Sequence, residues 1–335
     1  MTRSDFRNHV AVVTGASSGI GRATALLLAR SGASVVAAAR NGRALADLES
    51  SSRDLAGEIV AQPTDVTDAE AVWALAATAT NRFGRIDSWI NAAAVAMYAP
   101  VDRTEPDELR RILDVNVVGT ANGIQAVLPV MERQGGGTIV NIGSVESTRA
   151  LPFQSAYAAS KHAVRGLTDA LRAELAQRGS PIRLTLVMPS AINTPFFRHA
   201  RSKIGVVPQP IPPVYEPEAV AEAIVHAARH PMREIVVGGG GKGLALLEKV
   251  SPRAVDLLLG LPVLGRGLQR SDRPDDGRDN LDAPLDEPGS VHGEWGGMAR
   301  RRSWYTTLIG LHPIPARIAA LAAVGVAALV MRLRR

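Results

Sequence analysis

The stretch at residues 9–32 constrains the fold more than any other, because a strand pattern passes into a helix pattern across a run of glycines. The apolar, β-branched run at residues 9–13 predicts a buried strand. Residues 14–21 follow at once and contain three glycines. Residues 22–30 then repeat apolar side chains at helical spacing until a Ser-Gly pair ends the pattern. A strand, a glycine turn and a helix in this order indicate the first unit of an α/β fold.

A glycine turn between a strand and a helix is suited to binding the pyrophosphate group of a dinucleotide. Glycines allow the backbone to approach phosphate oxygens closely, and the helix N-terminus carries partial positive charge that favours an anion. An ordinary tight turn is the alternative interpretation, and the matching flanks on both sides argue against it. The sequence therefore predicts dinucleotide contacts along this turn, from Gly15, Ser17, Ser18, Gly19, Ile20 and Gly21.

The second predicted strand, at residues 33–39, is followed by Arg40, which bears on the choice of dinucleotide. A site that prefers NAD usually has an acid near this place, where it holds the ribose 2′-hydroxyl. A cation there pairs instead with a 2′-phosphate, so the sequence favours NADP(H) over NAD(H). A solvated arginine at a strand end is the alternative. After the third predicted strand, at residues 59–61, Asp65 and Val66 are well placed to meet the adenine ring.

Strand and helix patterns continue to alternate as far as residue 237. The remaining strands are expected at residues 87–90, 137–142, 182–188 and 233–237. This alternation predicts a Rossmann-like, doubly wound parallel sheet of seven strands with helices on both faces. Ligands on such sheets bind at the carboxyl ends of the strands. The residues that follow strands should therefore gather on one edge, among them Asp65, Asn91, Ser144 and Pro189.

Tyr157 and Lys161 are four residues apart on a predicted helix, so they share one face, one turn apart. An ammonium group beside a phenol favours the phenolate and is expected to lower the phenol's pKa from its ordinary value of about 10. Such a phenol can act as a general acid or base near neutral pH. Ser144, at the end of the preceding strand, can hydrogen-bond the same substrate oxygen. An incidental pair on a surface helix is the alternative interpretation.

Composition excludes several classes of protein. The chain has no cysteine, which excludes disulfides, Cys-zinc sites and thiol nucleophiles, and we predict no metal site. The net charge is +6, but residues 299–335 hold seven arginines and no acid, so subtracting seven leaves −1 for residues 1–298. This argues against a nucleic-acid-binding face on the body. The first strand begins near residue 10, which leaves no room for a signal peptide and predicts a cytoplasmic protein.

Together these motifs resemble the short-chain dehydrogenase/reductase family over about residues 8–240. The resemblance rests on the glycine turn, Asp65, the turn at Asn91, the Tyr157–Lys161 pair with Ser144 thirteen residues before it, and the motif at residues 189–194. Asn116, on an apolar helical stretch, completes the pattern; taken alone it is either a structural hydrogen-bonding residue or part of a site. The chain departs from the family at Asn91-Ala-Ala-Ala94, at Pro189-Ser190 and after residue 237.

The resemblance implies a role for each site residue. Tyr157 is the general acid or base, Lys161 lowers its pKa and holds the nicotinamide ribose, and Ser144 positions the carbonyl or hydroxyl group. Asn116 anchors a water molecule in a proton relay, while the Ile192 backbone and Thr194 bind the nicotinamide carboxamide. The resemblance also implies assembly into a homo-oligomer.

The predicted function is therefore an NADP(H)-dependent oxidoreductase that interconverts a carbonyl and a secondary alcohol. Hydride passes between C4 of the nicotinamide and the reacting carbon, and Tyr157 handles the proton. The proline-rich, partly apolar residues 196–215 suit a substrate lid and suggest an apolar small-molecule substrate. A non-catalytic NADP-binding scaffold or regulatory protein is the alternative.

We expect four segments along the chain. Residues 1–242 form the catalytic domain, residues 243–267 a helical extension packed on it, residues 268–299 a disordered linker, and residues 300–335 a basic and apolar tail. The tail holds fourteen uncharged residues at 318–331, which as a helix span about 21 Å, against about 30 Å for a bilayer core. It therefore lies on a membrane surface, spans a membrane, or docks on the body or a partner.

Overall fold

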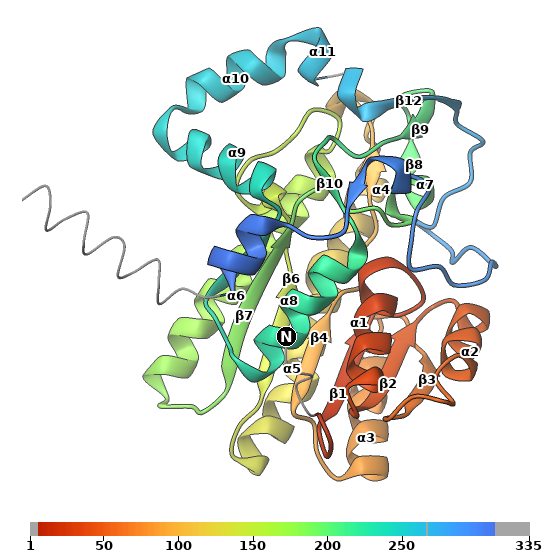
Figure 1. Cartoon of the computed structure of the whole chain (residues 1–335), viewed down its shortest axis with the longest axis vertical. Coiled ribbons are helices and arrows are strands. Elements are labelled where there is room, and N and C mark those ends of the chain that lie inside the picture. Colours follow the sequence, from red (N-terminus) through yellow and green to blue (C-terminus); the bar gives the residue numbers. More distant parts are fainter. Residues whose placement is uncertain (1–5, 266, 312–335) are drawn as a thin grey trace, which may run out of the picture.

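The computed structural model describes residues 6–265 and 267–311, and its centre is a parallel sheet of seven strands (Figure 1). The strands follow the order β11-β7-β6-β4-β1-β2-β3, and every neighbouring pair is parallel. The doubly wound α/β fold predicted from the alternation of patterns is thus confirmed. The strand bounds are β1 (Val10–Thr14), β2 (Ser34–Ala39), β3 (Ile59–Pro63), β4 (Ser88–Asn91), β6 (Thr138–Ile142), β7 (Arg183–Pro189) and β11 (Glu234–Val237).

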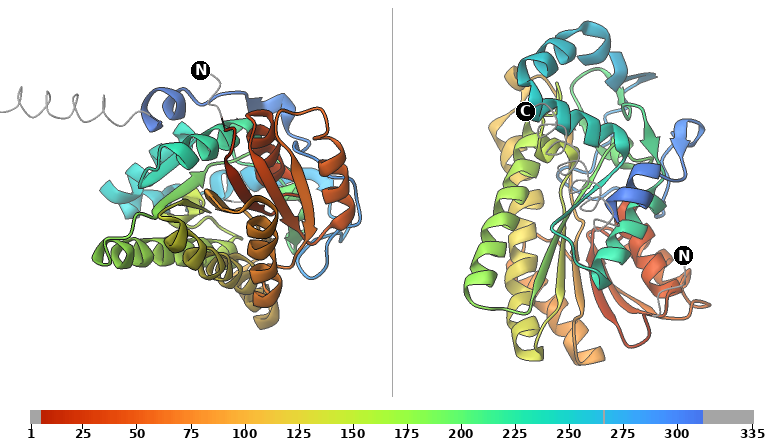
Figure 2. Two further views of the ribbon diagram at one scale, coloured as in Figure 1. Left: turned by 90° about the horizontal axis from the view of Figure 1, so that it is seen from below. Right: turned by 60° about the vertical axis from the view of Figure 1, so that its left-hand side comes forward.

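The sheet has a hydrophobic core on each face, because successive side chains of a strand point to opposite sides. In β1, Val13 packs into one core and Val12 into the other. The first core is covered by α1 (Gly19–Arg30), α2 (Gly42–Ser50) and α8 (Pro217–Arg229). The second is covered by α3 (Ala69–Phe83), α4 (Pro106–Leu113), α5 (Gly119–Gln134) and α6 (Ser155–Gln177) (Figure 2). Burial on both faces explains why the strands are short runs of Val, Ile and Ala rather than alternating patterns.

Short elements follow β4 and β7 above the carboxyl edge of the sheet. β5 (Met97–Tyr98) pairs with β8 (Arg201–Ser202), and α7 (Phe196–His199) lies just before β8. The sequence expectation of a lid at residues 196–215 therefore falls on a segment that has small elements of its own. Two further short strands complete it, β9 (Val206–Pro208) and β10 (Val214–Tyr215).

The extension begins with three helices, α9 (Gly239–Val250), α10 (Pro252–Gly260) and α11 (Pro262–Gly265). Prolines stand at the first position of α10 and α11, where the missing N–H costs no helical hydrogen bond. The chain then forms β12 (Arg270–Pro274), which pairs with β9, and later β13 (Ala299–Arg300), which pairs with β10. Both ends of residues 270–300 are therefore tied to the lid segment.

Residues 268–299 differ from the disordered linker that their composition suggests. Leu281 is fully buried, and Arg201 of β8 holds Asp279 at 2.9 Å and Asp282 at 2.7 Å. Composition predicted disorder because the segment has few large apolar residues, but its acids and backbone groups find partners on the catalytic domain. We call residues 279–293 the covering segment; Figure 1 shows it in blue at the right-hand side of the molecule, above α2.

The last described element is a π-helical turn, η6 (Thr306–Gly310), packed beside β11. The apolar run at residues 318–331, for which the sequence left three alternatives, lies outside the described residues. Within the described ranges, no helix combines the length and the apolar character needed to cross a membrane.

Candidate functional site

A cavity of about 520 Å³ opens at the carboxyl edge of the sheet, where the loops after six strands meet. Its wall includes residues that follow β1, β2, β3, β4, β6 and β7, as the strand-end argument predicted. Among them are Gly15, Ser17, Ser18, Gly19, Ile20, Gly21, Arg40, Asp65, Val66, Ser144, Ile192 and Thr194, joined by Tyr157 and Lys161 from α6.

The glycine turn after β1 is shaped by close backbone contacts. Gly15 has a φ of +69°, and a Cβ there would lie 2.7 Å from the backbone of Ala92 and Ala93. A Cβ at Gly21 would collide with the carbonyl oxygen of Gly15. The turn places the N-terminus of α1 in the cavity wall, where backbone N–H groups favour a pyrophosphate; the Thr194 side chain lies against Gly19 there.

Thr14 explains how the turn after β4 tolerates the sequence Asn91-Ala-Ala-Ala94. Its hydroxyl accepts hydrogen bonds from the backbone N–H groups of Ala92 at 3.1 Å and Ala93 at 3.3 Å. The turn is therefore held by the neighbouring strand rather than by a side chain of its own.

Asn91 does not line the cavity, which differs from its predicted place among the cofactor contacts. Its Oδ1 accepts a hydrogen bond from Trp89 Nε1 at 2.8 Å, and its Nδ2 donates to Asn141 Oδ1 at 2.9 Å. The side chain is 4% exposed, because both of its polar atoms are used inside the sheet layer. Asn91 thus supports the wall of the site from behind.

Asn116 is also buried behind the site. It lies in a π-helical turn, Asp114–Val118 (η2), between α4 and α5. Its Oδ1 accepts from the Val95 N–H at 2.9 Å, and its Nδ2 donates to the Val95 carbonyl at 3.0 Å and to Ser160 Oγ at 2.9 Å. Ser160 in turn donates to the backbone carbonyl of Tyr157 at 2.7 Å. The Asn116 side chain therefore positions the start of α6 and does not enter the cavity.

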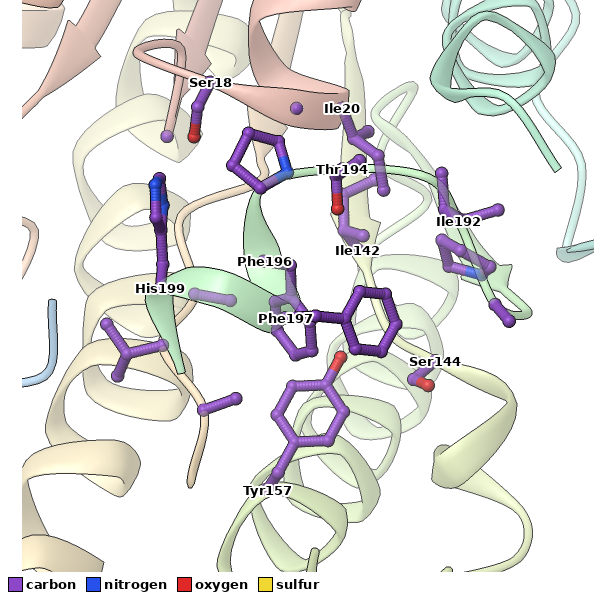
Figure 3. A pocket seen from close by; sticks show the side chains of 18 of the residues that line it. Ser18, Ile20, Ile142, Ser144, Tyr157, Ile192, Thr194, Phe196, Phe197 and His199 are labelled. Carbon is purple, nitrogen blue, oxygen red and sulfur yellow. The ribbon is translucent and has the colours of Figure 1, made fainter. Parts of the chain in front are cut away.

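Tyr157, Ser144 and Lys161 meet at the inner end of the cavity. Figure 3 shows the Tyr157 hydroxyl directed into the pocket, with Ser144 beside it. The two hydroxyl groups are hydrogen-bonded. Lys161 Nζ donates to the Ile142 carbonyl at 2.9 Å and lies 5.5 Å from the centre of the Tyr157 ring. The predicted triad is therefore assembled, with the ammonium against the ring rather than against the hydroxyl.

The pKa of Tyr157 moves in the direction opposite to the one the sequence suggested. Burial of the phenol and the nearby Glu146 carboxylate raise its pKa well above the ordinary value, and the Ser144 hydrogen bond opposes them. Burial also lowers the pKa of Lys161 to about 8, although Glu146 acts against this. The expected lowering of the tyrosine pKa by Lys161 was wrong, because burial and the Glu146 charge raise this pKa and only the Ser144 hydrogen bond opposes them.

Glu146 is a site residue that the sequence reasoning missed. It lies in a short helical turn, Val145–Ser147 (η3), directly after Ser144, and its side chain lines the cavity. It is 5% exposed, and burial raises its pKa to about 8, against a backbone hydrogen bond from Leu151 and the charge of Lys161. No motif signals a functional carboxyl here, because its importance comes only from burial and neighbours.

The adenosine end of the cavity is lined by Arg40 and Asp65. Arg40 donates to the backbone carbonyls of Asn280 at 2.5 Å and Asp282 at 3.1 Å in the covering segment. Asp65 Oδ2 is 3.3 Å from the guanidinium of Arg111, a second cation that the sequence reasoning did not single out. Arg40 borders the place where a ribose 2′-substituent is expected, whereas Arg111 lies behind Asp65 and does not line the cavity.

The covering segment forms the outer wall of this end. The N–H of Gly19 donates to the Ser290 carbonyl at 2.8 Å, which ties the segment to the glycine turn. Asn41 Nδ2 donates to the carbonyls of Leu285 at 2.6 Å and Glu287 at 3.0 Å. The Glu287 side chain lies 2.6 Å from His199 of α7. A dinucleotide in this cavity would be enclosed between the glycine turn and the covering segment.

The substrate end is mostly apolar. The ring of Phe196 packs edge-on to Tyr157 with centroids 5.3 Å apart. Leu151, before α6, also lines this end. Side chains of the lid segment and of the extension complete the wall, including Phe197, Ile211, Leu244, Leu258, Leu259 and Leu268. The extension thus borders both ends of one cavity.

The fold and this site define an NAD(P)-dependent oxidoreductase. Residues 9–205 match the family described as short chain dehydrogenase, and the chain belongs to that family. It is 36% identical over 305 residues to the oxidoreductase YxnA of Bacillus subtilis, covering 90% of this chain and 85% of that one. It is 35% identical over 254 residues to the oxidoreductase SadH of Mycobacterium tuberculosis, covering 74% of this chain and 92% of that one.

Two solved structures are similar in fold. A short chain dehydrogenase/reductase from Burkholderia phymatum in complex with NAD has a TM-score of 0.68 and 26% identity, covering 75% of this chain and 96% of that one. An alcohol dehydrogenase from Thermococcus sibiricus complexed with 5-hydroxy-NADP has a TM-score of 0.60 and 26% identity, covering 68% of this chain and 95% of that one. The first of these structures holds NAD and the second holds an NADP derivative.

Proposed function

We propose that the protein interconverts a carbonyl and a secondary alcohol on an apolar molecule, with Tyr157 as the general acid or base. One observation carries this proposal: the Tyr157 hydroxyl, hydrogen-bonded to Ser144, faces a cavity that continues to the glycine turn. The bound dinucleotide supplies or accepts the hydride. Ser144 and Tyr157 hold the substrate oxygen between them, and Tyr157 gives or takes the proton on that oxygen.

The raised pKa of Tyr157 favours the reducing direction. A phenol whose pKa lies above its ordinary value stays protonated at neutral pH, and reduction of a carbonyl requires a proton donor at the oxygen. For oxidation, the same phenol must first lose its proton, so that direction should gain from alkaline pH. We therefore propose that the protein acts mainly as a carbonyl reductase near pH 7.

We propose NADP(H) as the preferred dinucleotide. Arg40 follows β2, lines the cavity, and donates hydrogen bonds to two neutral backbone carbonyls of the covering segment. A 2′-phosphate would offer the guanidinium a charged acceptor, which forms a stronger hydrogen bond than a carbonyl does. In the same proposal, Lys161 holds the nicotinamide ribose, and the Ile192 backbone with Thr194 holds the carboxamide.

The test is turnover by the purified full-length chain. NADPH absorbance is followed with a panel of aliphatic, alicyclic and aromatic ketones, with small sugars as the polar comparison. We expect the apolar ketones to be reduced and the sugars to be poor substrates; faster turnover of sugars would contradict the proposed substrate class. A non-catalytic dinucleotide-binding scaffold predicts NADPH binding without turnover of any member.

We also propose that the tail works at an anionic membrane surface together with the outer face of α9–α11. Six of the eleven large apolar side chains that the described chain exposes lie on this segment, among them Leu257 and Val263. Its two acids, Glu248 and Asp256, both pair with Arg149 of the catalytic domain. The outer face is therefore apolar and basic, which suits anionic lipid. The exposed bases are Lys242, Lys249 and Arg253.

The described chain ends beside this face, which supports the same partner. The Gly238 N–H, directly before α9, donates to Thr306 Oγ1 of η6 at 3.0 Å. Figure 1 shows η6 in dark blue next to the start of α9. The described chain therefore ends close to the N-terminus of α9. Leu258 is both exposed and part of the cavity wall. An apolar substrate could therefore enter the cavity from lipid beside Leu258.

Assembly into a homo-oligomer remains a proposal that rests on the family. The two long helices α5 and α6 lie side by side on the second face of the sheet, and Val118 at the start of α5 is 45% exposed. Light scattering on the purified protein measures the oligomeric state, and Val118→Glu is the variant expected to disrupt the assembly.

A further inference from the structure

Glu146 is a buried carboxyl at the substrate end of the cavity that the proposed proton transfer does not use. Its backbone N–H donates to Ser144 Oγ at 3.1 Å, so its place is fixed relative to the residue that holds the reacting oxygen. The charged and titratable groups that face it are Lys161 and Tyr157 of α6 and Tyr98 of β5. Whatever Glu146 binds therefore lies next to the reacting carbon.

One oxygen of this carboxyl is satisfied and the other is not. The backbone N–H of Leu151 hydrogen-bonds the carboxyl group. Oε2 is buried and has no hydrogen-bond partner anywhere in the described chain. Buried polar atoms in folded proteins are nearly always paired, so an orphan oxygen in a cavity wall points to a partner that arrives with a ligand.

The protonation state of Glu146 indicates which partner fits. Burial raises its pKa to about 8, so the carboxyl is mostly neutral at pH 7. A neutral carboxyl has one O–H donor and further acceptor capacity. It can therefore pair with a hydroxyl or a keto oxygen without bringing a charge into an apolar pocket.

We propose that Glu146 hydrogen-bonds a second, neutral oxygen of the substrate, a hydroxyl or keto group a few carbon atoms from the carbonyl held by Ser144 and Tyr157. The rest of the pocket takes an apolar body, because its wall is built from leucines and phenylalanines. This inference rests on the proposed function and narrows it. The substrate class is an apolar molecule that carries two oxygen functions at one end.

The experiment compares matched pairs of alicyclic ketones that differ only by a hydroxyl or keto group a few carbon atoms from the reacting carbonyl. For the wild type we expect kcat/KM to favour the doubly oxygenated member by roughly 10- to 100-fold, because the plain ketone leaves Oε2 unpaired. Glu146→Gln, a neutral isostere with a donor and an acceptor, should keep most of this preference. Glu146→Leu should reduce this preference to about onefold.

Binding gives a second readout that does not need turnover. The same ketones are titrated into the NADPH complex of each variant, with NADPH fluorescence as the signal. The proposal requires the affinity ratio within a pair to collapse in Glu146→Leu and to persist in Glu146→Gln. A preference that survives in Glu146→Leu, or an equal loss for both members of a pair, overturns it. An aminoketone bound better than the hydroxyketone overturns it as well, because that result indicates an ionised Glu146.

The two proposals fail in different ways. If the wild type binds the ketones but reduces none of them, the proposed function is wrong, and the affinity ratios still decide the role of Glu146. If the wild type reduces both members of each pair equally well, the oxidoreductase assignment stands and the role of Glu146 is refuted. Glu146→Gln serves as the folding control because it changes neither size nor shape.

Discussion

The contact between Asp279 and Arg201 offers the sharpest test of the covering segment. Asp279 Oδ2 accepts from Arg201 Nε at 2.9 Å, and its Oδ1 accepts from Arg201 Nη2 at 3.2 Å. Neither side chain lines the cavity, so changing them removes no contact with a bound dinucleotide. The Asp279→Asn variant also keeps an oxygen for the Leu281 N–H, which Asp279 Oδ1 accepts at 2.9 Å. The substitution therefore loosens the segment without disturbing the pocket directly.

The size of the effect follows from the geometry. A hydrogen bond to a charged group contributes about 1.5–3 kcal/mol, and partial exposure of this pair places the loss near the lower end, at about 1.5 kcal/mol. Arg201 keeps Glu108 and Asp282 as partners, so no buried charge is left unpaired. A loss of about 1.5 kcal/mol raises the population of the open segment roughly tenfold. If the dinucleotide leaves only through the open form, its release should accelerate by the same factor.

The assay is stopped-flow displacement of NADPH by excess NADP⁺, with hydrogen exchange at residues 279–293 measured on the same samples. Asp276→Asn is the matched control, because the Asp276 side chain hydrogen-bonds locally, accepting from the Arg278 N–H two residues away. Exchange and release should both accelerate in Asp279→Asn and stay at wild-type values in Asp276→Asn. Faster exchange with unchanged release would show that the segment covers the site without controlling it.

Four further outcomes are expected. Tyr157→Phe should lower kcat by about 10²- to 10⁴-fold, because the variant lacks the proton donor. The dissociation constant of NADPH should stay near the wild-type value. If kcat is retained, Tyr157 is not the general acid or base. Arg40→Ala should weaken NADPH binding by roughly tenfold or more and NADH binding hardly at all, and equal losses in isothermal titration would mean that Arg40 meets no 2′-phosphate. Folding raises the pKa of Glu146 from 4.5 to about 8, so the contribution of Glu146 to the free energy of unfolding is complete below about pH 4.5 and is lost as the pH rises through 8. Calorimetry of the wild type should therefore show Tm falling over this pH range. In Glu146→Gln, this fall in Tm should be smaller by a few degrees. Truncation after Leu311, or the pair Leu257→Gln and Val263→Gln, should reduce co-sedimentation with anionic vesicles but not with neutral ones, and unchanged partitioning would rule out the membrane surface.

Much of the fold was predictable because it depends on patterns that are local in sequence. The runs at β1 and β2 are buried on both faces and read as strands without help from tertiary structure. The spacing of Tyr157 and Lys161 placed them on one helix face, and the strand-end rule gathered Arg40 and Ser144 at one edge.

What the sequence could not provide depends on burial and on distant partners. The pKa of Tyr157 follows from exclusion of solvent and from Glu146, neither of which a spacing of four residues reveals. Asn91 and Asn116 looked like site residues, but their polar atoms hydrogen-bond other buried groups, among them Asn141 and the Val95 backbone, which are distant in sequence. The covering segment was missed because its order comes from partners on the catalytic domain rather than from apolar residues of its own.

The route of the extension bears on how the protein can be divided. The family match ends at residue 205 and the seventh strand at Val237, so a fragment cut there would look like a complete domain by topology. Such a fragment would lack Leu244 and Leu258 at one end of the cavity and Leu285 and Ser290 at the other. The smallest functional unit should therefore extend at least to η6. Fusions or truncated forms designed from the sheet alone would keep the seven-stranded sheet but lose part of the cavity wall.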